Sequence, residues 1–319
     1  MKMFSFKLQE PVEVLNSVKP ESQIQQFADR ACVACRGVKY RPAGHKFEHA
    51  LWRCLRCRSI FADVSKSSES VSELYDHYYD GAHFQMPPTV ARSLARLVLS
   101  FEEVRSTGRF LDIGYGEGGL LGIAQEHKWN CYGLEVSPHA LEYGCKQGWT
   151  VSSDGEADER FPAGGFDVVT MIELLEHVPD PDRFLKSASR WLRPGGVLYI
   201  TTPNANSFNS RFLGLEWSVF SPPEHITIWT TRGLSSALKR AGLEVKKVRT
   251  EGFNPAEIVA RMRTRKGESV EVNRNQAGLA LNNALSGSGF RRSLKTGINN
   301  CLNLLRTGDS LKVRAVRSQ

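Results

Sequence analysis

Two acidic residues and a histidine stand close together in one short segment, Glu173-Leu174-Leu175-Glu176-His177. Their spacing of i, i+3 and i+4 predicts that Glu173, Glu176 and His177 occupy neighbouring positions on one helical turn. Two carboxylates and an imidazole in such a cluster can bind a divalent cation or supply a general base. This segment is therefore a candidate for chemistry, and a purely structural role for it stays open.

A glycine-rich loop lies upstream, where the apolar run from Phe110 ends in Asp112 and is followed by glycines at 114, 116 and 118. Glycines let the backbone turn sharply and approach a ligand closely, so this pattern predicts the strand–loop–helix that opens a nucleotide-type site. The segment Cys131–Val136 reads as a second strand that carries Glu135, about twenty residues further on, where an acid can accept both hydroxyls of a ribose. We expect the following residues to bind the cofactor: Asp112, Gly114, Gly116, Gly118 and Glu135.

Four of the seven cysteines form two pairs, Cys32-x-x-Cys35 and Cys54-x-x-Cys57, separated by 18 residues. Two such knuckles can aim four thiolates at one ion, which predicts a structural zinc ribbon over residues 26–62. His45 and His49 lie between the knuckles and are alternative ligands, although surface positions suit them better. Many basic residues surround the module, so nucleic-acid binding by the ribbon is a further alternative.

The elements that position these residues follow an alternation of strand and helix from residue 109 onward, which implies a parallel sheet covered on both faces. Ligands of such sheets bind at the carboxyl ends of the strands, where the motifs lie. Residues 243–248 read as strand six, and residues 308–316 alternate with period two and read as a delayed strand seven. The intervening insertion, about 255–305, is predicted to be partly helical at 277–285 and 294–305 and to form a lid or substrate wall. The main domain is expected to span 75–319.

The glycine spacing separates two cofactor classes. NAD enzymes carry G-x-G-x-x-G, whereas G-x-G-x-G after Asp112 resembles motif I of class I S-adenosylmethionine (SAM)-dependent methyltransferases. Residues 166–172 resemble the fourth strand of that family, and Leu192-Arg193-Pro194-Gly195-Gly196 resembles its turn into the fifth. The resemblance implies a Rossmann-like α/β fold with a seven-stranded, mostly parallel sheet. It also implies that the loop wraps the methionine half of SAM and that further cofactor contacts come from Asp158, Met171 and, over the pocket, Tyr78 and Tyr79.

The E-x-x-E-H segment is also similar to that of ubiquinone-pathway O-methyltransferases, where it binds Mg²⁺, and of small-RNA 2′-O-methyltransferases, where a distant histidine joins it. In this chain, His225 in Pro223-Glu224-His225-Ile226 matches that histidine. The resemblance implies either a divalent site of Glu173, Glu176, His177 and His225, or metal-free catalysis with His225 or His177 as the base and Glu173 as a further catalytic candidate. The RNA enzyme's other substrate-binding parts are not recognisable here.

The combination of ribbon and class I domain most resembles zinc-ribbon methyltransferases of natural-product and surface-polysaccharide pathways. We therefore expect methyl transfer to a small-molecule or sugar acceptor, with a nucleic-acid methyltransferase and a non-catalytic SAM-binding module as alternatives. Residues 261–319 carry 12 Lys and Arg against 3 Asp and Glu, which suits either a solvated surface or an anionic substrate. No apolar run is long enough to span a membrane and no signal peptide is recognisable, so a cytoplasmic location is expected.

Overall fold

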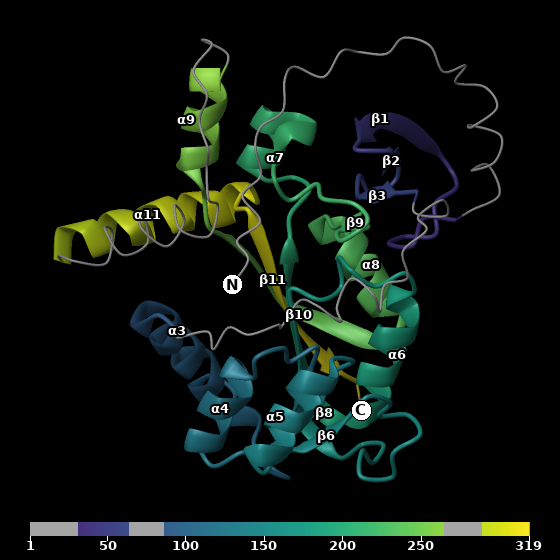
Figure 1. The fold of residues 1–319 in the computed structure, drawn as a ribbon, viewed down its shortest axis with the longest axis vertical. Helices are drawn as coiled ribbons and strands as arrows, with labels where there is room; N and C mark the ends of the chain where they lie inside the picture. The colour runs from purple at the N-terminus through teal and green to yellow at the C-terminus, as the bar shows by residue number, and fades with distance from the viewer. Residues whose placement is uncertain (1–30, 64–85, 265–288, 319) are drawn as a thin grey trace.

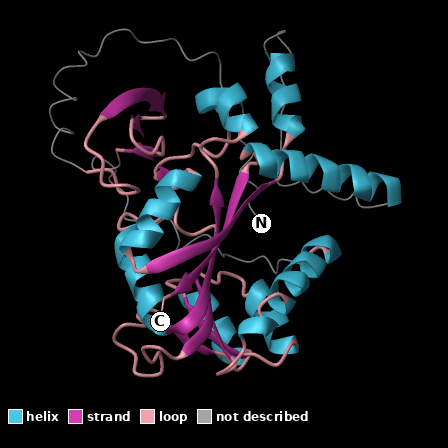
Figure 2. Cartoon of the chain, turned by 180° about the vertical axis from the view of Figure 1, so that it is seen from behind, coloured by secondary structure: helices cyan, strands magenta, loops and turns pink. Residues whose placement is uncertain are grey.

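The computed structural model describes residues 31–63, 86–264 and 289–318. Its centre is a seven-stranded sheet in the order β10-β11-β8-β7-β4-β5-β6, which Figure 2 shows as a twisted layer between helices. The strands are β4 (Arg109–Ile113), β5 (Asn130–Leu134), β6 (Thr150–Ser152), β7 (Phe166–Ile172), β8 (Leu192–Pro203), β10 (Leu243–Glu251) and β11 (Ser310–Arg317). The sequence-based prediction of a seven-stranded sheet is therefore confirmed.

All neighbouring strands from β8 to β6 pair in parallel. The last strand, β11, is inserted between β8 and β10 and runs antiparallel to both. This is the delayed strand seven that the alternating pattern predicts. It carries Leu311, Val313 and Ala315 into the core while the residues between them are less buried, which is the period of two expected of a strand.

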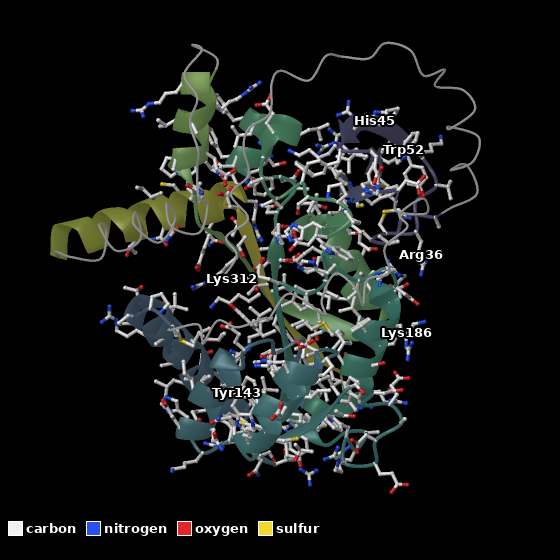
Figure 3. All side chains as sticks on the ribbon, in the orientation of Figure 1. Arg36, His45, Trp52, Tyr143, Lys186 and Lys312 are labelled. Atoms are coloured by element: carbon white, nitrogen blue, oxygen red, sulfur yellow. The ribbon has the colours of Figure 1, made fainter. Side chains whose placement is uncertain are left out.

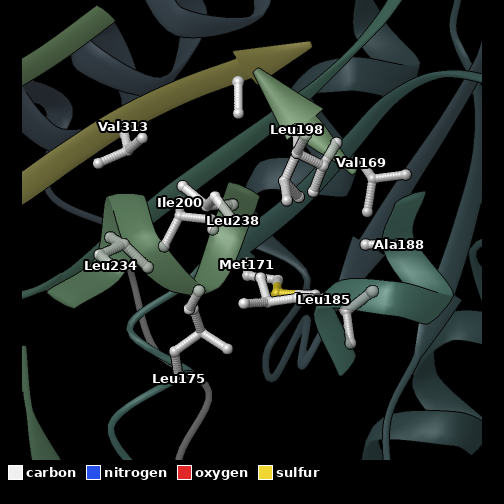
Figure 4. Packing of buried hydrophobic residues seen from close by; sticks show 14 of the residues in the cluster. Val169, Met171, Leu175, Leu185, Ala188, Leu198, Ile200, Leu234, Leu238 and Val313 are labelled. Carbon is white, nitrogen blue, oxygen red and sulfur yellow. The ribbon is translucent and has the colours of Figure 1, made fainter. Parts of the chain in front are cut away.

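Helices cover the two faces of the sheet in separate groups (Figure 1). On one face, α6 (Pro181–Trp191) and α8 (Thr231–Arg240) contribute Leu185, Ala188, Leu234 and Leu238 to an apolar cluster with the strand residues Val169, Leu198 and Ile200 (Figure 4). On the other face, a second cluster comes from α3 (Pro88–Leu99), α4 (Gly119–Glu126) and α5 (Pro138–Lys146), with the short helix η1 (Glu102–Val104) beside them. Strand β7 is buried along nearly its whole length because both faces are covered.

Helix starts are encoded locally by a capping residue followed by proline. Ser137 and Asp180 accept hydrogen bonds from backbone amides of α5 and α6, and the next residue is proline in both cases. A short polar side chain satisfies an amide that the helix leaves unpaired, and proline at the first helical position needs no partner for its nitrogen. These two caps therefore set where α5 and α6 begin.

The four-cysteine ribbon, residues 31–63, contains β1 (Tyr40–Lys46), β2 (His49–Cys54) and β3 (Ile60–Ala62). Its sheet is completed by β9 (Thr227–Ile228), which belongs to the main domain, in the order β1-β2-β3-β9. Figure 1 shows the ribbon directly above β9 and α8. At its other end, Arg36, which Figure 3 labels, pairs with Asp182 at the start of α6. His49 is buried and its Nδ1 lies 3.1 Å from the Asp63 carbonyl, so the expected surface position was wrong for this histidine, whereas His45 is exposed.

Helices α7 (Phe208–Leu213), η2 (Gly214–Glu216), α9 (Pro255–Thr264) and α11 (Gly289–Leu305) complete the described elements. Both α9 and α11 fall between β10 and β11, and the predicted helical stretch 294–305 lies within α11. The predicted stretch 277–285 is outside the described residues. None of the described helices has the length and apolar character needed to cross a bilayer.

Candidate active site

The glycine loop after β4 has the backbone conformation that its composition predicts. Gly114, Gly116 and Gly118 all have positive φ, at 72°, 53° and 73°. A Cβ at Gly118 would lie 2.4 Å from the Trp149 ring, and one at Gly114 would lie 2.9 Å from Leu174. Both positions therefore favour glycine for φ, and Gly118 also requires it for space, whereas at Gly114 the end of the Leu174 side chain would have to move.

Asp112 lies beneath this loop and is almost completely buried. Thr170 on the neighbouring strand β7 donates a hydrogen bond to its Oδ1 at 2.6 Å. Burial raises the pKa of Asp112 to about 7, helped by the nearby charge of Glu135 and opposed by the Thr170 hydrogen bond. Asp112 by itself is therefore costly to ionise, and a cationic ligand beside it would stabilise its charge.

Glu135, which follows β5, closes the loop from the other side. Its Oε2 accepts a hydrogen bond from the Gly116 amide at 3.0 Å, and its Oε1 accepts from the Val136 amide at 2.7 Å. The structure thus brings together Asp112, the three glycines and Glu135, the five residues that the pattern at 110–135 singles out. Their contacts with a cofactor stay predictions.

The other predicted cofactor contacts lie in different surroundings. Asp158 accepts from the Arg160 side chain at 2.9 and 3.1 Å, and this pairing lowers the pKa of Asp158 to about 2. Met171 is fully buried among apolar side chains beside Leu175 and Leu185 (Figure 4). Roles for Asp158 and Met171 in cofactor binding stay predictions, and Tyr78 and Tyr79 lie outside the described residues.

The segment 173–177 is not a helical turn, so that part of the sequence analysis was wrong. Glu173 follows β7 with a φ of 50°, in the left-handed region, and residues 175–177 form a tight turn in which the His177 amide donates to the Leu174 carbonyl at 3.0 Å. The Glu173 amide donates to the Thr201 carbonyl at 2.9 Å on β8, which holds this bend. As a result Glu173 is exposed while Glu176 points inward.

Glu176, His177 and His225 nevertheless come together, with one ligand atom from each lying within 4.8 Å of the others. His177 Nε2 is 3.9 Å from Glu176 Oε1, and the two imidazole centroids are 4.6 Å apart. Thr202 donates to Glu176 Oε2 at 2.9 Å, whereas Oε1 is buried and accepts from none of the described residues. We call these three residues the Glu-His-His cluster.

Backbone carbonyls orient both imidazoles of this cluster. His177 Nδ1 lies 3.0 Å from the Glu224 carbonyl, and His225 Nδ1 lies 2.7 Å from the Val219 carbonyl. A carbonyl only accepts, so Nδ1 of each ring carries a proton, and in the neutral form of either ring the lone pair is on Nε2. Histidines that ligate metals are oriented in this way.

Burial also sets the charge of the cluster. It raises the pKa of Glu176 well above its usual range, and the nearby Glu173 carboxylate adds to the effect. Burial, together with the neighbouring His225, lowers the pKa of His177 to about 4, so this imidazole is neutral at neutral pH. A buried carboxylate beside two imidazoles gains from a cation that replaces its proton.

The four cysteines form a second cluster, and their Sγ atoms all lie within 4.8 Å of one another. All four are buried and none is in a disulfide. The Cys32–Cys57 and Cys35–Cys54 sulfur pairs are 3.7 and 3.6 Å apart, close to the roughly 3.8 Å between ligands of a tetrahedral Zn²⁺ with 2.3 Å bonds. Neither His45 nor His49 belongs to this cluster. The donor set and spacing therefore fit zinc.

Three supporting residues were missed by the sequence analysis. Thr170 and Thr202 hold the carboxylates of Asp112 and Glu176, and Trp149 packs against Gly118. Threonines within otherwise apolar, buried strands are the signal that could have found the first two, because a buried hydroxyl needs a partner.

Several known proteins are similar to this chain. A model of the methyltransferase domain family matches residues 82–248. Ubiquinone biosynthesis O-methyltransferase of Marinobacter nauticus is 33% identical over 182 residues, covering 52% of this chain and 74% of that protein. The enzyme of the same name from Parvibaculum lavamentivorans is 33% identical over 177 residues, covering 50% and 67%. The solved structure of a SAM-dependent methyltransferase from Archaeoglobus fulgidus has a TM-score of 0.48 at 19% identity, over 76% of this chain and 98% of that chain.

Proposed function

The chain belongs to the methyltransferase domain family and is a SAM-dependent methyltransferase, and we propose that it methylates a hydroxyl group of a small molecule with the help of a divalent cation. The observation that carries this proposal is the Glu-His-His cluster, in which a buried carboxylate oxygen and two oriented imidazoles converge. The names of the similar ubiquinone biosynthesis O-methyltransferases support an oxygen acceptor.

SAM supplies a methyl group on a sulfonium, which an oxygen nucleophile attacks in line. The loop from Gly114 to Gly118 and the carboxylate of Glu135 would hold the cofactor, with Asp112 providing negative charge beneath the loop. The protein's main contribution is then to align the acceptor oxygen with the methyl group and to help remove its proton.

The Glu-His-His cluster suits a cation better than a general base. A phenol-like hydroxyl has a pKa of about 10, so proton removal by a His177 whose pKa is about 4 is uphill by about 8 kcal/mol. A divalent cation held by Glu176, His177 and His225, with the exposed Glu173 nearby, would lower the pKa of a hydroxyl bound to it. Metal-free catalysis with His225 as the base is the competing proposal.

Binding of S-adenosylhomocysteine, measured by calorimetry, tests the cofactor half of the proposal. Loss of the Glu135 carboxylate in Glu135→Ala should weaken binding by about tenfold or more, because charge-assisted hydrogen bonds to the ribose are lost. Glu126→Ala, at an exposed acid on α4, is the matched control and should bind normally. Equal affinity in all three proteins would refute the assignment of Glu135.

Methyl transfer to a panel of phenols, sugars and RNA tests the acceptor half. His225→Ala should lose turnover and keep its affinity for S-adenosylhomocysteine, and a parallel fall in that affinity would refute an acceptor-side role.

Chelation by EDTA should abolish turnover, and Mg²⁺ or Mn²⁺ should restore it. Full turnover after chelation would favour metal-free catalysis with His225 as the base. RNA binding that weakens steeply with salt, with methylation of RNA alone, would favour a nucleic-acid acceptor.

A further inference from the structure

The four-cysteine ribbon is joined by backbone hydrogen bonds to the chain segment that carries His225. Strand β3 pairs antiparallel with β9, with Ile60 opposite Ile228 and Phe61 opposite Thr227. The Ala62 amide donates to the Ile226 carbonyl at 2.9 Å, one residue beyond His225. The next amides, those of Ile226 and Thr227, donate to the Glu176 carbonyl at 2.8 and 3.1 Å. The ribbon and the Glu176 carbonyl therefore both bind the backbone at Ile226 and Thr227, directly after His225.

Two buried hydroxyls tie the second cysteine knuckle to the end of this strand. Ser59, two residues after Cys57, accepts a hydrogen bond from the Thr230 amide at 3.1 Å. The Thr230 hydroxyl donates to the Cys57 carbonyl at 2.7 Å. Both side chains are fully buried. Thr230 also caps α8 by accepting from the Gly233 amide at 3.0 Å, and a Cβ at Gly233 would lie 2.3 Å from Ser59 Oγ. The knuckle, β9 and the start of α8 are thus one packed unit.

The residues that precede His225, from Leu215 to Phe220, also contact the ribbon. Lys46 on β1 donates to the Leu215 carbonyl at 2.7 Å. Apolar residues from both parts form one buried cluster: Leu51 and Ile60 from the ribbon with Trp217, Val219, Phe220 and Ile228 from the main domain. The Val219 carbonyl in this cluster is the group that orients His225.

From these contacts we propose that the ribbon positions His225, and that Ser59 and Thr230 are the positioning residues through which a metal-loaded second knuckle acts on it. The consequence for catalysis rests on the proposed function, but the positioning itself does not. A knuckle closed around zinc would hold the Cys57 carbonyl and Ser59, and these hold Thr230, two residues after β9. The Ala62 amide, which follows β3 residue Phe61, holds the Ile226 carbonyl directly after His225.

Hydrogen exchange of the zinc-loaded full chain tests the proposal without relying on activity. Ser59→Ala should increase exchange of the amides at 226–230 by about tenfold, because a buried hydrogen bond is lost, while the glycine loop at 114–118 keeps its protection. Thr230→Val should behave like Ser59→Ala, and Thr230→Ser, which keeps the hydroxyl, should restore protection. Ser93→Ala removes an exposed hydroxyl on α3 and should change nothing.

Zinc content, affinity for S-adenosylhomocysteine and turnover are measured on the same samples. The proposal expects Ser59→Ala to retain zinc and cofactor affinity and to lose about tenfold in turnover, in step with the exchange at 226–230. Unchanged exchange at 226–230 in both Ser59→Ala and Thr230→Val would overturn it, whatever the turnover. Failure of the wild-type chain to need a divalent cation would instead refute the proposed cation site and leave the exchange result standing.

Discussion

Replacement of Asp112 by Asn should stabilise the ligand-free protein and weaken its binding of SAM. The wild-type carboxyl is buried under the glycine loop, where burial raises its pKa from 3.8 to about 7. Asparagine keeps the shape and can still accept the Thr170 hydrogen bond through its amide oxygen, but it carries no charge. The substitution therefore removes the cost of a buried charge together with the charge that a cationic cofactor would use.

The size of the effect follows from linkage. A group whose pKa is higher in the folded than in the unfolded state binds more protons when folded, so the protein loses stability as pH rises between the two values. For Asp112 this window runs from about pH 4 to pH 7. A difference of about 3 units corresponds to about 4 kcal/mol. The free energy of unfolding of Asp112→Asn, relative to that of the wild type, should therefore rise by up to about 4 kcal/mol across this window and level off above it.

Urea unfolding of both proteins at intervals from pH 4.5 to 8.5 measures this difference. Asp158→Asn is the matched control, because the pKa of Asp158 is lowered to about 2 by Arg160 and both of its titrations lie below this range. Its difference from wild type should be flat with pH. A flat difference for Asp112→Asn as well would refute the reasoning, since it would mean that the charge of Asp112 costs nothing in the folded state. Calorimetry at pH 8 should show weaker SAM binding by Asp112→Asn.

The remaining predictions concern the loop, its neighbours and the C-terminal strand. Gly118→Ala should lower the free energy of unfolding by about 2 kcal/mol or more and weaken S-adenosylhomocysteine binding, because φ is 73° and Trp149 leaves no room. Its control is Gly122→Ala on α4, where the space around the glycine is open. This control should be neutral or stabilising in urea unfolding and should bind normally in calorimetry. Thr202→Val should reduce turnover more than cofactor affinity, because it removes the donor to Glu176 Oε2; equal losses in the two assays would contradict this. Asn204→Ala should cost about 2 kcal/mol of stability in urea, because its side chain donates to the Arg306 and Gly308 carbonyls ahead of β11.

Much of the fold could be predicted because local patterns and the sheet rules agree. The acid and glycines at 112–118 and the alternation in β11 each specify an element from its own residues. Parallel strands then bring their carboxyl ends to one edge, and this gathers Asp112, Glu135 and Glu173 without further information.

The parts that could not be predicted depend on contacts between distant segments. Glu173 adopts a left-handed conformation because its amide is held by Thr201 on β8, and nothing in the spacing of 173–177 reveals that partner. Strand β9 has two residues, too few for a pattern, and exists because β3 lies beside it. The pairing of Asp158 with Arg160 is local, yet it was also not predicted, because the spacing of two residues alone does not show which way the two side chains turn.

The register of the sheet also explains why the glycine loop at 114–118 and the bend that leads into the Glu-His-His cluster are neighbours. Ile113 on β4 lies opposite Met171 on β7, so the loop that starts at Gly114 and the bend at Glu173 leave the sheet side by side. Leu174 in that bend packs on Gly114, where a Cβ would come within 2.9 Å. The two loops are therefore in direct contact. Gly114 therefore matters to both segments, because its φ of 72° turns the glycine loop and its missing side chain leaves room for Leu174 in the bend.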